Sequence, residues 1–341
     1  MMKFTKTFAL KVKNLHIKNF KSIIDLEIVE PNPFTVFVGP NGSGKSNIFE
    51  ALEFLSFNLF FNKYRLFGGN ENLNNRSTGL EGRYELIMNS SEGKLEEYGN
   101  YMTRDEIDYN KFHFTLGGVT CSEKESKKNQ EFTDRFRRIF NRIFVGKRHL
   151  IKLNYEDSLK LNVAASNLEK VLKRILQDET KREGIKEWLD LFIPGFADIK
   201  IVSSELSSTD TLVMYETGIE KPFTKDLLSD GTYNILALLT AVYQSDEPQF
   251  LCIEEPENGL HPKVIKELVH FFREACQEKG HYIWLNTHSQ TLVSELKPEE
   301  VILVNKKRGK TTIKQLTNHD LHGLSMDEAW LTAALGGGLP W

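Results

Sequence analysis

Residues 39–46 have the composition and spacing of a loop that binds phosphate groups. Their sequence, Gly-Pro-Asn-Gly-Ser-Gly-Lys-Ser, matches the pattern G-x-x-x-x-G-K-[ST] at every fixed position. Glycines permit positive φ angles and let a phosphate approach backbone N–H groups closely. In such a loop the ammonium of Lys45 reaches the β- and γ-phosphates, and the hydroxyl of Ser46 ligates Mg²⁺. The sequence therefore predicts a site for a nucleoside triphosphate.

The segments on either side of this loop are those that it requires. Residues 34–38 are β-branched and aromatic, which favours a short strand, and residues 47–55 place apolar side chains at helical spacing. A strand, a glycine turn and a helix start together aim backbone N–H groups at one point. The helix dipole adds positive potential there.

A second set of polar residues follows two apolar segments in the other half of the chain. The strand expected at 250–254 ends in the pair Glu254 and Glu255, and the strand expected at 282–286 is followed by Thr287 and His288. In proteins with a phosphate loop, a neighbouring strand supplies an acid to the Mg²⁺ shell. Glu254 fits that role, and Glu255 would then orient or deprotonate the attacking water. His288 either contacts the γ-phosphate or caps the next helix.

Residues 228–232, Leu-Ser-Asp-Gly-Thr, precede an apolar helix expected at 233–243. A serine and a glycine at a helix N-terminus make an anion-binding site. Because the chain already contains one phosphate site, a second one suggests closure over the nucleotide of a partner subunit.

The remaining pattern predicts three strands within 13–38 and an inserted lobe over 62–225. Residues 122–129 are charged and are expected to form a solvated loop. Residues 131–148 alternate basic and aromatic side chains at helical spacing. Two interpretations stay open for this segment: an amphipathic helix with a solvated basic face, or a surface for nucleic acid or an acidic partner.

Composition limits the class of protein. The net charge of −3 over 341 residues gives no overall basic field, so nucleic-acid binding would need a local patch. The three cysteines, Cys121, Cys252 and Cys276, have no paired spacing, which favours free thiols in a reducing compartment. No apolar run reaches about 18 residues, so no membrane contact is expected. We expect a cytoplasmic protein.

In order, the segments G-P-N-G-S-G-K-S-N, L-S-D-G-T, I-E-E-P-E-N-G-L-H-P and N-T-H-S resemble the ABC-type ATPases of the SMC, RecF and OLD group. The resemblance is nearest to the compact bacterial AAA family ATPases associated with anti-phage defence. Residues 15–23 are similar to that group's first strand. The resemblance covers 13–58 and 225–306 well and the lobe between them weakly.

The resemblance implies an α/β fold, an ABC-type head with a mixed sheet, antiparallel N-terminal strands and an inserted, mostly helical lobe. The implied domains are 1–61, with Walker A; 62–225, the lobe; and 226–341, with the signature, Walker B, the switch histidine and a tail. ATP and Mg²⁺ are the implied cofactors.

The implied site residues fall into three groups. Catalysis would use Glu255, His288 and Lys45, and the metal would be held by Ser46 and Glu254. The residues that would bind the nucleotide are Lys21, Gly39, Pro40, Asn41, Gly42, Ser43, Gly44, Lys45, Ser46, Asn47, Ser229, Asp230 and Gly231. Two departures stand out: Glu254 replaces the aspartate of many relatives, and the signature reads S-D-G-T instead of S-G-G-Q.

Two such heads would enclose ATP as a homodimer or a higher oligomer. The separation of 183 positions from Ser46 to Ser229 is too short for a long coiled coil, and the segment after 305 is too short for a nuclease domain. The leading hypothesis is therefore an ATP-hydrolysing dimeric sensor or switch that controls a separate effector, such as a nuclease or toxin, in anti-phage defence. The alternatives are a RecF-like repair ATPase with DNA or RNA as partner, and a nucleotide-dependent scaffold that does not hydrolyse ATP.

Overall fold

The computed structural model describes residues 10–56, 67, 73, 83–100, 123–146, 159–203, 210–316, 321, 324–332 and 335. These residues form two compact units, one from 1–140 together with 296–341 and the other from 141–295. The predicted division at 61 and 225 stays a prediction. None of the described helices is both long and apolar enough to cross a lipid bilayer.

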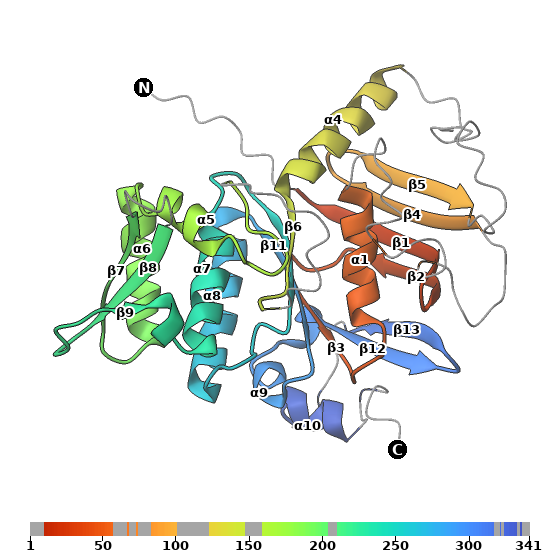
Figure 1. Ribbon diagram of the computed structural model, residues 1–341. Coiled ribbons are helices and arrows are strands. Elements are labelled where there is room, and N and C mark those ends of the chain that lie inside the picture. The colour runs from red at the N-terminus through yellow and green to blue at the C-terminus, as the bar shows by residue number, and fades with distance from the viewer. Residues whose placement is uncertain are drawn as a thin grey trace, which may run out of the picture. The chain divides into compact units, whose positions relative to one another are not determined.

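A four-stranded antiparallel sheet forms one part of the first unit (Figure 1). Its strands are β1 (Val12–Phe20), β2 (Ile23–Val29), β4 (Arg83–Ser90) and β5 (Lys94–Asn100), in the order β2-β1-β4-β5. The predicted strands at the N-terminal end are therefore confirmed as a hairpin. Helix α1 (Lys45–Ser56) packs on this sheet through Phe54, whose ring meets Phe20 and Tyr84 edge to face.

Three further strands of the first unit position the phosphate loop. Strand β12 (Val301–Lys307) pairs in parallel with β3 (Phe34–Val38) and antiparallel with β13 (Lys310–Gln315). All five residues of β3 are buried. Phe37 of β3 meets Phe49 of α1 edge to face, so the strand and the helix that flank the loop share a core. Helices η3 (Pro298–Glu300) and α10 (Met326–Leu331) also belong to this unit.

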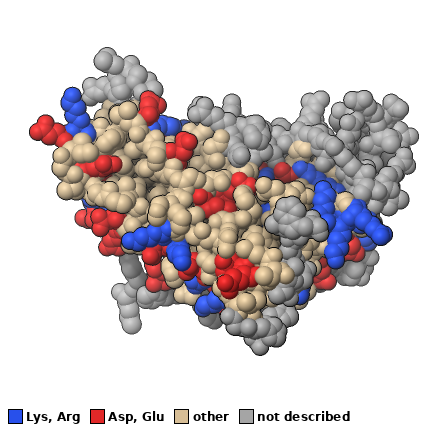
Figure 2. All heavy atoms as spheres, turned by 90° about the horizontal axis from the view of Figure 1, so that it is seen from below, with Lys and Arg blue, Asp and Glu red and all other residues tan. Residues whose placement is uncertain are grey.

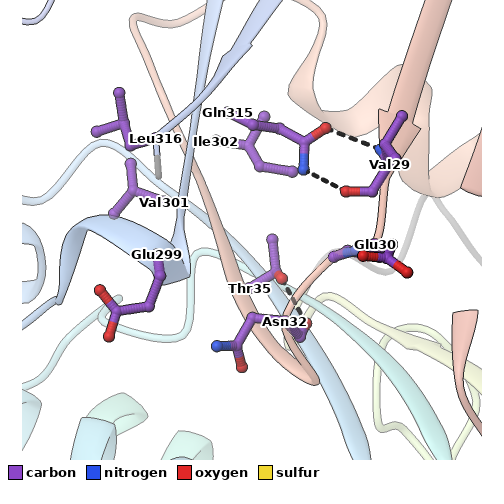
Figure 3. A pocket seen from close by; sticks show the side chains of 10 residues that line it. Val29, Glu30, Asn32, Thr35, Glu299, Val301, Ile302, Gln315 and Leu316 are labelled. Carbon is purple, nitrogen blue, oxygen red and sulfur yellow. Dashed lines mark hydrogen bonds between the residues drawn. The ribbon is translucent and has the colours of Figure 1, made fainter. Parts of the chain in front are cut away.

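A hollow of about 520 Å³ opens near Asn32, before β3 begins, whereas the phosphate loop follows the other end of this strand. Here the side-chain amide of Gln315 accepts from the backbone N–H of Val29 and donates to its carbonyl oxygen, both at 2.8 Å (Figure 3). These bonds imitate a strand pair and tie β13 to β2. None of the predicted site residues lines this hollow.

Two predictions about the basic segment are wrong. Helix α4 runs from Glu123 to Ile139, so the charged residues expected in a loop are largely helical. The expected helix over 131–148 ends at Ile139 and gives way to strand β6 (Phe140–Ile143). As a consequence Arg142 belongs to a strand and is buried. Local periodicity could not show this change, because Phe136, Phe140 and Ile143 continue the apolar helical spacing across the boundary.

The second unit is built on β10 (Phe250–Glu254) and β11 (Tyr282–Thr287), which pair in parallel and are buried along their whole length. Helix α7 (Asp230–Tyr243) is buried on nearly every side, as its apolar sequence indicates. Helix α8 (Pro262–Lys279) begins at a proline and ends at Gly280 in the left-handed conformation, as its sequence predicts. Helix α9 (Gln290–Val293) follows β11.

The rest of the second unit is a helical layer and a small meander. Helices α5 (Leu168–Ile175) and α6 (Glu179–Phe192) pack on α7, and Trp188 of α6 meets Phe271 of α8. Strands β7 (Phe196–Ser203), β8 (Asp210–Glu216) and β9 (Phe223–Thr224) form an antiparallel sheet, followed by the short helix η2 (Lys225–Leu227) (Figure 1).

Candidate functional site

The phosphate loop is held in shape by contacts from β12 and β13. A Cβ on Gly44, whose φ is +102°, would lie 2.1 Å from the hydroxyl oxygen of Thr311. That hydroxyl donates to the carbonyl of Ser43 at 2.9 Å and lies 2.6 Å from the hydroxyl oxygen of Ser22. Only glycine fits at position 44, on grounds of both backbone angle and space.

The cation and the hydroxyls of the loop differ in their partners and in their burial. The Lys45 ammonium is largely buried and donates to the carbonyl oxygens of Gly39, at 2.6 Å, and Pro40, at 3.0 Å. Ser43 Oγ is buried and has no hydrogen-bond partner among the described residues. A buried hydroxyl without a partner is costly unless a ligand satisfies it. Ser46 is half-buried in the first turn of α1, and Asn41 and Gly42 form the exposed tip of the loop.

Two other predicted nucleotide-binding residues make contacts inside the first unit. The side-chain amide of Asn47 donates to Ser22 Oγ at 2.6 Å, which adds to the support under the loop. Lys21 has a positive φ of 52° and forms an ion pair with Glu50 of α1. Neither contact was predicted from the sequence, because both join residues that lie more than 20 positions apart.

In the second unit, Glu254 ends β10 and is paired with a buried arginine. Arg142 Nε donates to Glu254 Oε1 at 2.6 Å, and its terminal Nη2 approaches the same oxygen. Asn286 of β11 donates to Glu254 Oε2 at 3.2 Å. The side chains of Arg142 and Glu254 are each only 2% exposed. Sequence analysis missed Arg142, since its short strand carries no motif.

Glu255 follows in a backbone conformation that is unfavourable for a residue other than glycine. Its φ is +46°, and its N–H donates to the carbonyl oxygen of Asn286 at 3.0 Å. The side chain accepts from Asn258 Nδ2 at 3.0 Å, and its other oxygen lies 3.9 Å from His288 Nδ1. Strained backbone of this kind concentrates at functional sites. The structure therefore brings Glu255 and His288 together, and the cap of α9 is Ser289 instead of the histidine.

A further carboxyl group, Glu257, lies beside this pair. Thr287 Oγ1 donates to Glu257 Oε1 at 2.5 Å, while Oε2 is buried with no partner among the described residues. Burial raises the pKa of the Glu257 carboxyl, because water no longer stabilises its charge. Thr287 precedes His288, so Glu257 braces the end of β11. The alternation of glutamates at 255 and 257 was the only sequence signal for it.

The segment 229–231 at the start of α7 packs against the loop that carries these glutamates. Ser229 caps the helix, accepting from the N–H of Thr232 at 3.1 Å, and both Ser229 and Asp230 are exposed. A Cβ on Gly231 would lie 2.3 Å from the carbonyl oxygen of Gly259. Asn234 of the same helix donates to the carbonyl oxygens of Pro256, at 3.0 Å, and Asn258, at 2.9 Å.

These residues fit MgATP by their chemistry. The loop offers backbone donors, a lysine and an unpartnered hydroxyl to phosphate, and Ser46 and Glu254 offer oxygen ligands to Mg²⁺. The part of the chain that the structure describes contains no group of three or more metal-binding side chains. Proteins usually hold Mg²⁺ through one or two carboxylates together with substrate phosphates. The loop belongs to one compact unit and Glu254, Glu255, His288 and Ser229 to the other, so their joint action stays a prediction.

Several known proteins are similar to parts of this chain. The Rad50 DNA double-strand break repair ATPase of Methanococcus maripaludis is 25% identical over 219 residues, which are 57% of this chain and 21% of the relative. The chromosome partition protein Smc of Methanocaldococcus jannaschii is 50% identical over 44 residues, 13% of this chain and 4% of the relative. The chain thus spans about a fifth or less of these proteins.

Solved structures agree on the fold. A crystal structure of an Smc head bound to the C-winged helix domain of ScpA superimposes with a TM-score of 0.56 at 15% identity, covering 92% of this chain and 99% of that one. An Smc head with an extended coiled coil, bound to the C-terminal domain of ScpA derived from Pyrococcus furiosus, gives a TM-score of 0.52 at 14% identity, covering 96% and 99%. The expected ABC-type head fold is confirmed.

One family model matches residues 34–294, a span that runs from β3 through the phosphate loop to the end of the second unit. Its description is "AAA domain, putative AbiEii toxin, Type IV TA system". The ordered motifs, the head fold and the similarity to Rad50 and Smc proteins agree with this match. The chain belongs to this AAA-domain family and has the ABC-type head fold of the SMC and RecF group.

Proposed function

We propose that this protein binds and hydrolyses MgATP as a dimeric switch that controls a separate effector in defence against phage. The observation that carries the hydrolytic part is the arrangement at the ends of β10 and β11. There one carboxylate, Glu254, is fully buried, and a second, Glu255, is partly exposed beside His288. Because the two carboxylates differ in their access to solvent, only Glu255 can act on a water molecule, and Glu254 is left to bind the metal.

The roles follow from the surroundings of each side chain. Lys45 and the N–H groups of the loop bind the phosphates, and Ser46 and Glu254 hold Mg²⁺, which neutralises charge on the phosphate oxygens. Glu255, 27% exposed at its side chain, has access to the attacking water and orients it. His288, 42% exposed, contacts the γ-phosphate and registers its loss.

Turnover by the Glu255→Gln variant tests this proposal. We expect ATP hydrolysis to fall by roughly a hundredfold or more, the usual scale for general-base catalysis, with ATP affinity retained. Glu220→Gln removes the charge of an exposed carboxylate in the same unit and should hydrolyse ATP like the wild type. Unchanged hydrolysis in Glu255→Gln would show that the assignment is wrong. Binding of ATP without phosphate release by the wild type would instead favour the scaffold hypothesis.

The dimer part of the proposal concerns Ser229 and Gly231. Both lie at the N-terminus of α7, where the helix dipole and free N–H groups attract an anion, and Ser229 is exposed. We expect the Glu255→Gln protein to dimerise with ATP, and Ser229→Arg in that background to remain monomeric. Sedimentation velocity with ATP and with ADP measures this. A Ser229→Arg protein that still dimerises would contradict the enclosed-nucleotide arrangement.

The defence role is supported by the family's description, which names a toxin of a type IV toxin–antitoxin system. Co-expression of this chain with the product of its neighbouring gene tests it. We expect the pair to protect cells from phage, and Lys45→Ala to abolish that protection because the switch can no longer bind ATP. If the product of the neighbouring gene protects cells without this chain, then this chain has no role in the defence.

A second candidate function, DNA or RNA binding, is favoured by the turn between β12 and β13. Lys306, Lys307, Arg308 and Lys310 are all exposed there and form no ion pair with a described residue. Lys307 lies directly opposite Lys310, where like charges repel, and Arg308 has a φ of +49°. Lys and Arg side chains gather at one edge of the face drawn in Figure 2.

The turn therefore concentrates positive charge despite two unfavourable local features, the repulsion between Lys307 and Lys310 and the positive φ of Arg308. Arg135 and Arg137 of α4 differ, since they are paired with Glu92 and Asp134. The basic side chains on α4 are thus a weaker choice for a nucleic-acid surface than the β12–β13 turn. A phosphate backbone would neutralise the turn and release counterions.

Lys307→Glu separates a nucleic-acid contact from a structural role. It would pair with Lys310 across the turn and stabilise the hairpin by about 0.2–1 kcal/mol, while weakening DNA and RNA binding and its dependence on salt. Fluorescence anisotropy with labelled single and double strands measures the affinity. Lys263→Glu makes the same charge change at an exposed position of α8 and should bind like the wild type. If the two variants bind DNA and RNA with equal affinity, then the β12–β13 turn is not the nucleic-acid surface.

A further inference from the structure

The buried pair of Arg142 and Glu254 has a consequence for metal binding. Glu254 Oε1 accepts a hydrogen bond from Arg142 Nε and also pairs with the terminal Nη2 of the same arginine. Glu254 Oε2 accepts a hydrogen bond from Asn286 Nδ2. Each carboxylate oxygen therefore already has a donor. The net charge of the pair is zero, so a cation that approaches Glu254 meets a carboxylate whose charge is compensated.

The local structure fixes the arginine at this place. The neighbouring Asn141 donates to the carbonyl oxygen of Leu161 at 3.1 Å, and the N–H of Phe144 donates to the carbonyl oxygen of Val163 at 2.6 Å. These bonds anchor β6 on both sides of Arg142. The other arginines of the basic segment for which the structure gives ion pairs, Arg135 and Arg137, are 23% and 20% exposed, against 2% for Arg142.

Burial of this pair makes its partners interdependent. Removing water from two charges is costly, and the pair is tolerated because each charge compensates the other. Loss of the arginine alone would leave an uncompensated buried carboxylate. A divalent cation is the other species that could compensate it, since Glu254 offers the oxygen ligand that Mg²⁺ prefers.

We propose that Arg142 is a positioning residue that acts as the built-in counter-cation of Glu254, so that a divalent metal binds in competition with its charge. This inference rests on the proposed function, in which Glu254 belongs to the Mg²⁺ shell. Arg142 compensates the charge of the carboxylate before the metal arrives. It also weakens metal affinity, which ties metal binding to the phosphates that MgATP brings.

The test measures Mn²⁺ affinity by electron paramagnetic resonance on the full chain with a saturating non-hydrolysable ATP analogue. Replacing Arg142 by Met or Gln should tighten Mn²⁺ binding roughly tenfold, because a nearby positive charge is removed. The same variants should have a lower Tm than wild type in EDTA, and Mn²⁺ should raise that Tm more than it does for the wild type. Arg142→Lys keeps the charge and should bind Mn²⁺ like the wild type.

Further variants keep the outcomes distinct. Arg142→Gln retains a donor to Glu254 and carries the test if Arg142→Met does not fold. Unchanged or weaker Mn²⁺ binding by the folded neutral variants would overturn the inference. Glu254→Gln should weaken Mn²⁺ binding; if it does not, the metal role of Glu254 in the proposed function fails, whatever the arginine variants show. Arg142→Met combined with Glu254→Gln should recover Tm in EDTA relative to Arg142→Met alone, since no buried charge is then left uncompensated.

Discussion

The phosphate loop and the carboxylate cluster differ in how the chain builds them. The loop takes its shape from eight consecutive residues that run from the end of one strand into the first turn of one helix, with support from Thr311 and Ser22. The cluster draws on residues from β6, α7, β10 and β11, which are far apart in the sequence. A site made from one segment can be recognised from its sequence motif, whereas a site made from four segments depends on how the whole unit packs.

The difference also concerns charge. At the loop, backbone N–H groups and an ammonium that donates to carbonyl oxygens of the loop itself provide a positive surface. In the cluster, charged groups are balanced by distant side chains, as Glu254 is by Arg142. Changes within the loop should therefore affect ligand binding most, and changes around the cluster should affect stability and catalysis together.

The largest effect is expected at Gly44. Gly44→Ala would place a Cβ 2.1 Å from Thr311 Oγ1 on a backbone with φ of +102°, so the loop must move. We expect ATP affinity to fall by roughly a hundredfold or more, because the loop N–H groups no longer converge on the phosphates. Gly42→Ala is the matched control: its φ is +75°, but nothing lies within 4 Å of its added Cβ.

Isothermal titration with ATP measures both glycine variants, and the circular dichroism spectrum checks that they fold. Gly42→Ala should carry only the left-handed strain of about 1–2 kcal/mol, with a correspondingly smaller loss of affinity. If both variants lose the same affinity, then contact with Thr311 does not shape the loop, and only the backbone angle at each glycine matters for ATP binding.

The sequence predicted the local features of both sites and missed the long-range ones. The loop, its flanking strand and helix, the carboxylates after β10 and the histidine after β11 are each set by neighbouring residues, and all are where they were expected. Arg142 was assigned to a helix, because a four-residue strand after a helix has no periodicity of its own. Glu257, Thr287 and Asn234 gain their roles from contacts across about 22 to 30 positions. No local pattern reports such contacts.

A smaller effect is expected from His281, which precedes β11 at the end of the strand opposite the cluster. Its ring is buried, Nδ1 accepts from the N–H of Gln249 at 3.0 Å, and burial lowers its pKa to about 4. In the unfolded chain the imidazole has a pKa near 6.5, so that state binds the proton first as the pH falls. Stability is therefore lost between about pH 6.5 and pH 4, by at most about 3 kcal/mol.

Urea unfolding of the second unit at pH 7.5, 6 and 4.5 measures this loss. His281→Gln removes the titrating group and should show a shallower fall in unfolding free energy than His270→Gln, which changes an exposed histidine on α8. Other groups also titrate in this range, so the difference between the two variants is the quantity that isolates His281. If the unfolding free energy of the two variants falls equally with pH, then the His281 ring does not contribute to the pH dependence of stability.

The smallest effect is expected at Asn234. This residue gives the most direct test of whether the phosphate loop and the carboxylate cluster are supported separately. Asn234→Ala leaves the carbonyl oxygens of Pro256 and Asn258 without their donor, at a cost of about 1–3 kcal/mol in unfolding free energy. Asn89→Ala, which removes one half-buried bond to Asn14, should cost less. Because Asn234 fixes the loop that holds Glu255, we expect its loss to lower kcat for ATP while leaving the affinity for ATP nearly unchanged. A parallel loss of affinity would mean that the loop and the cluster are not separately supported.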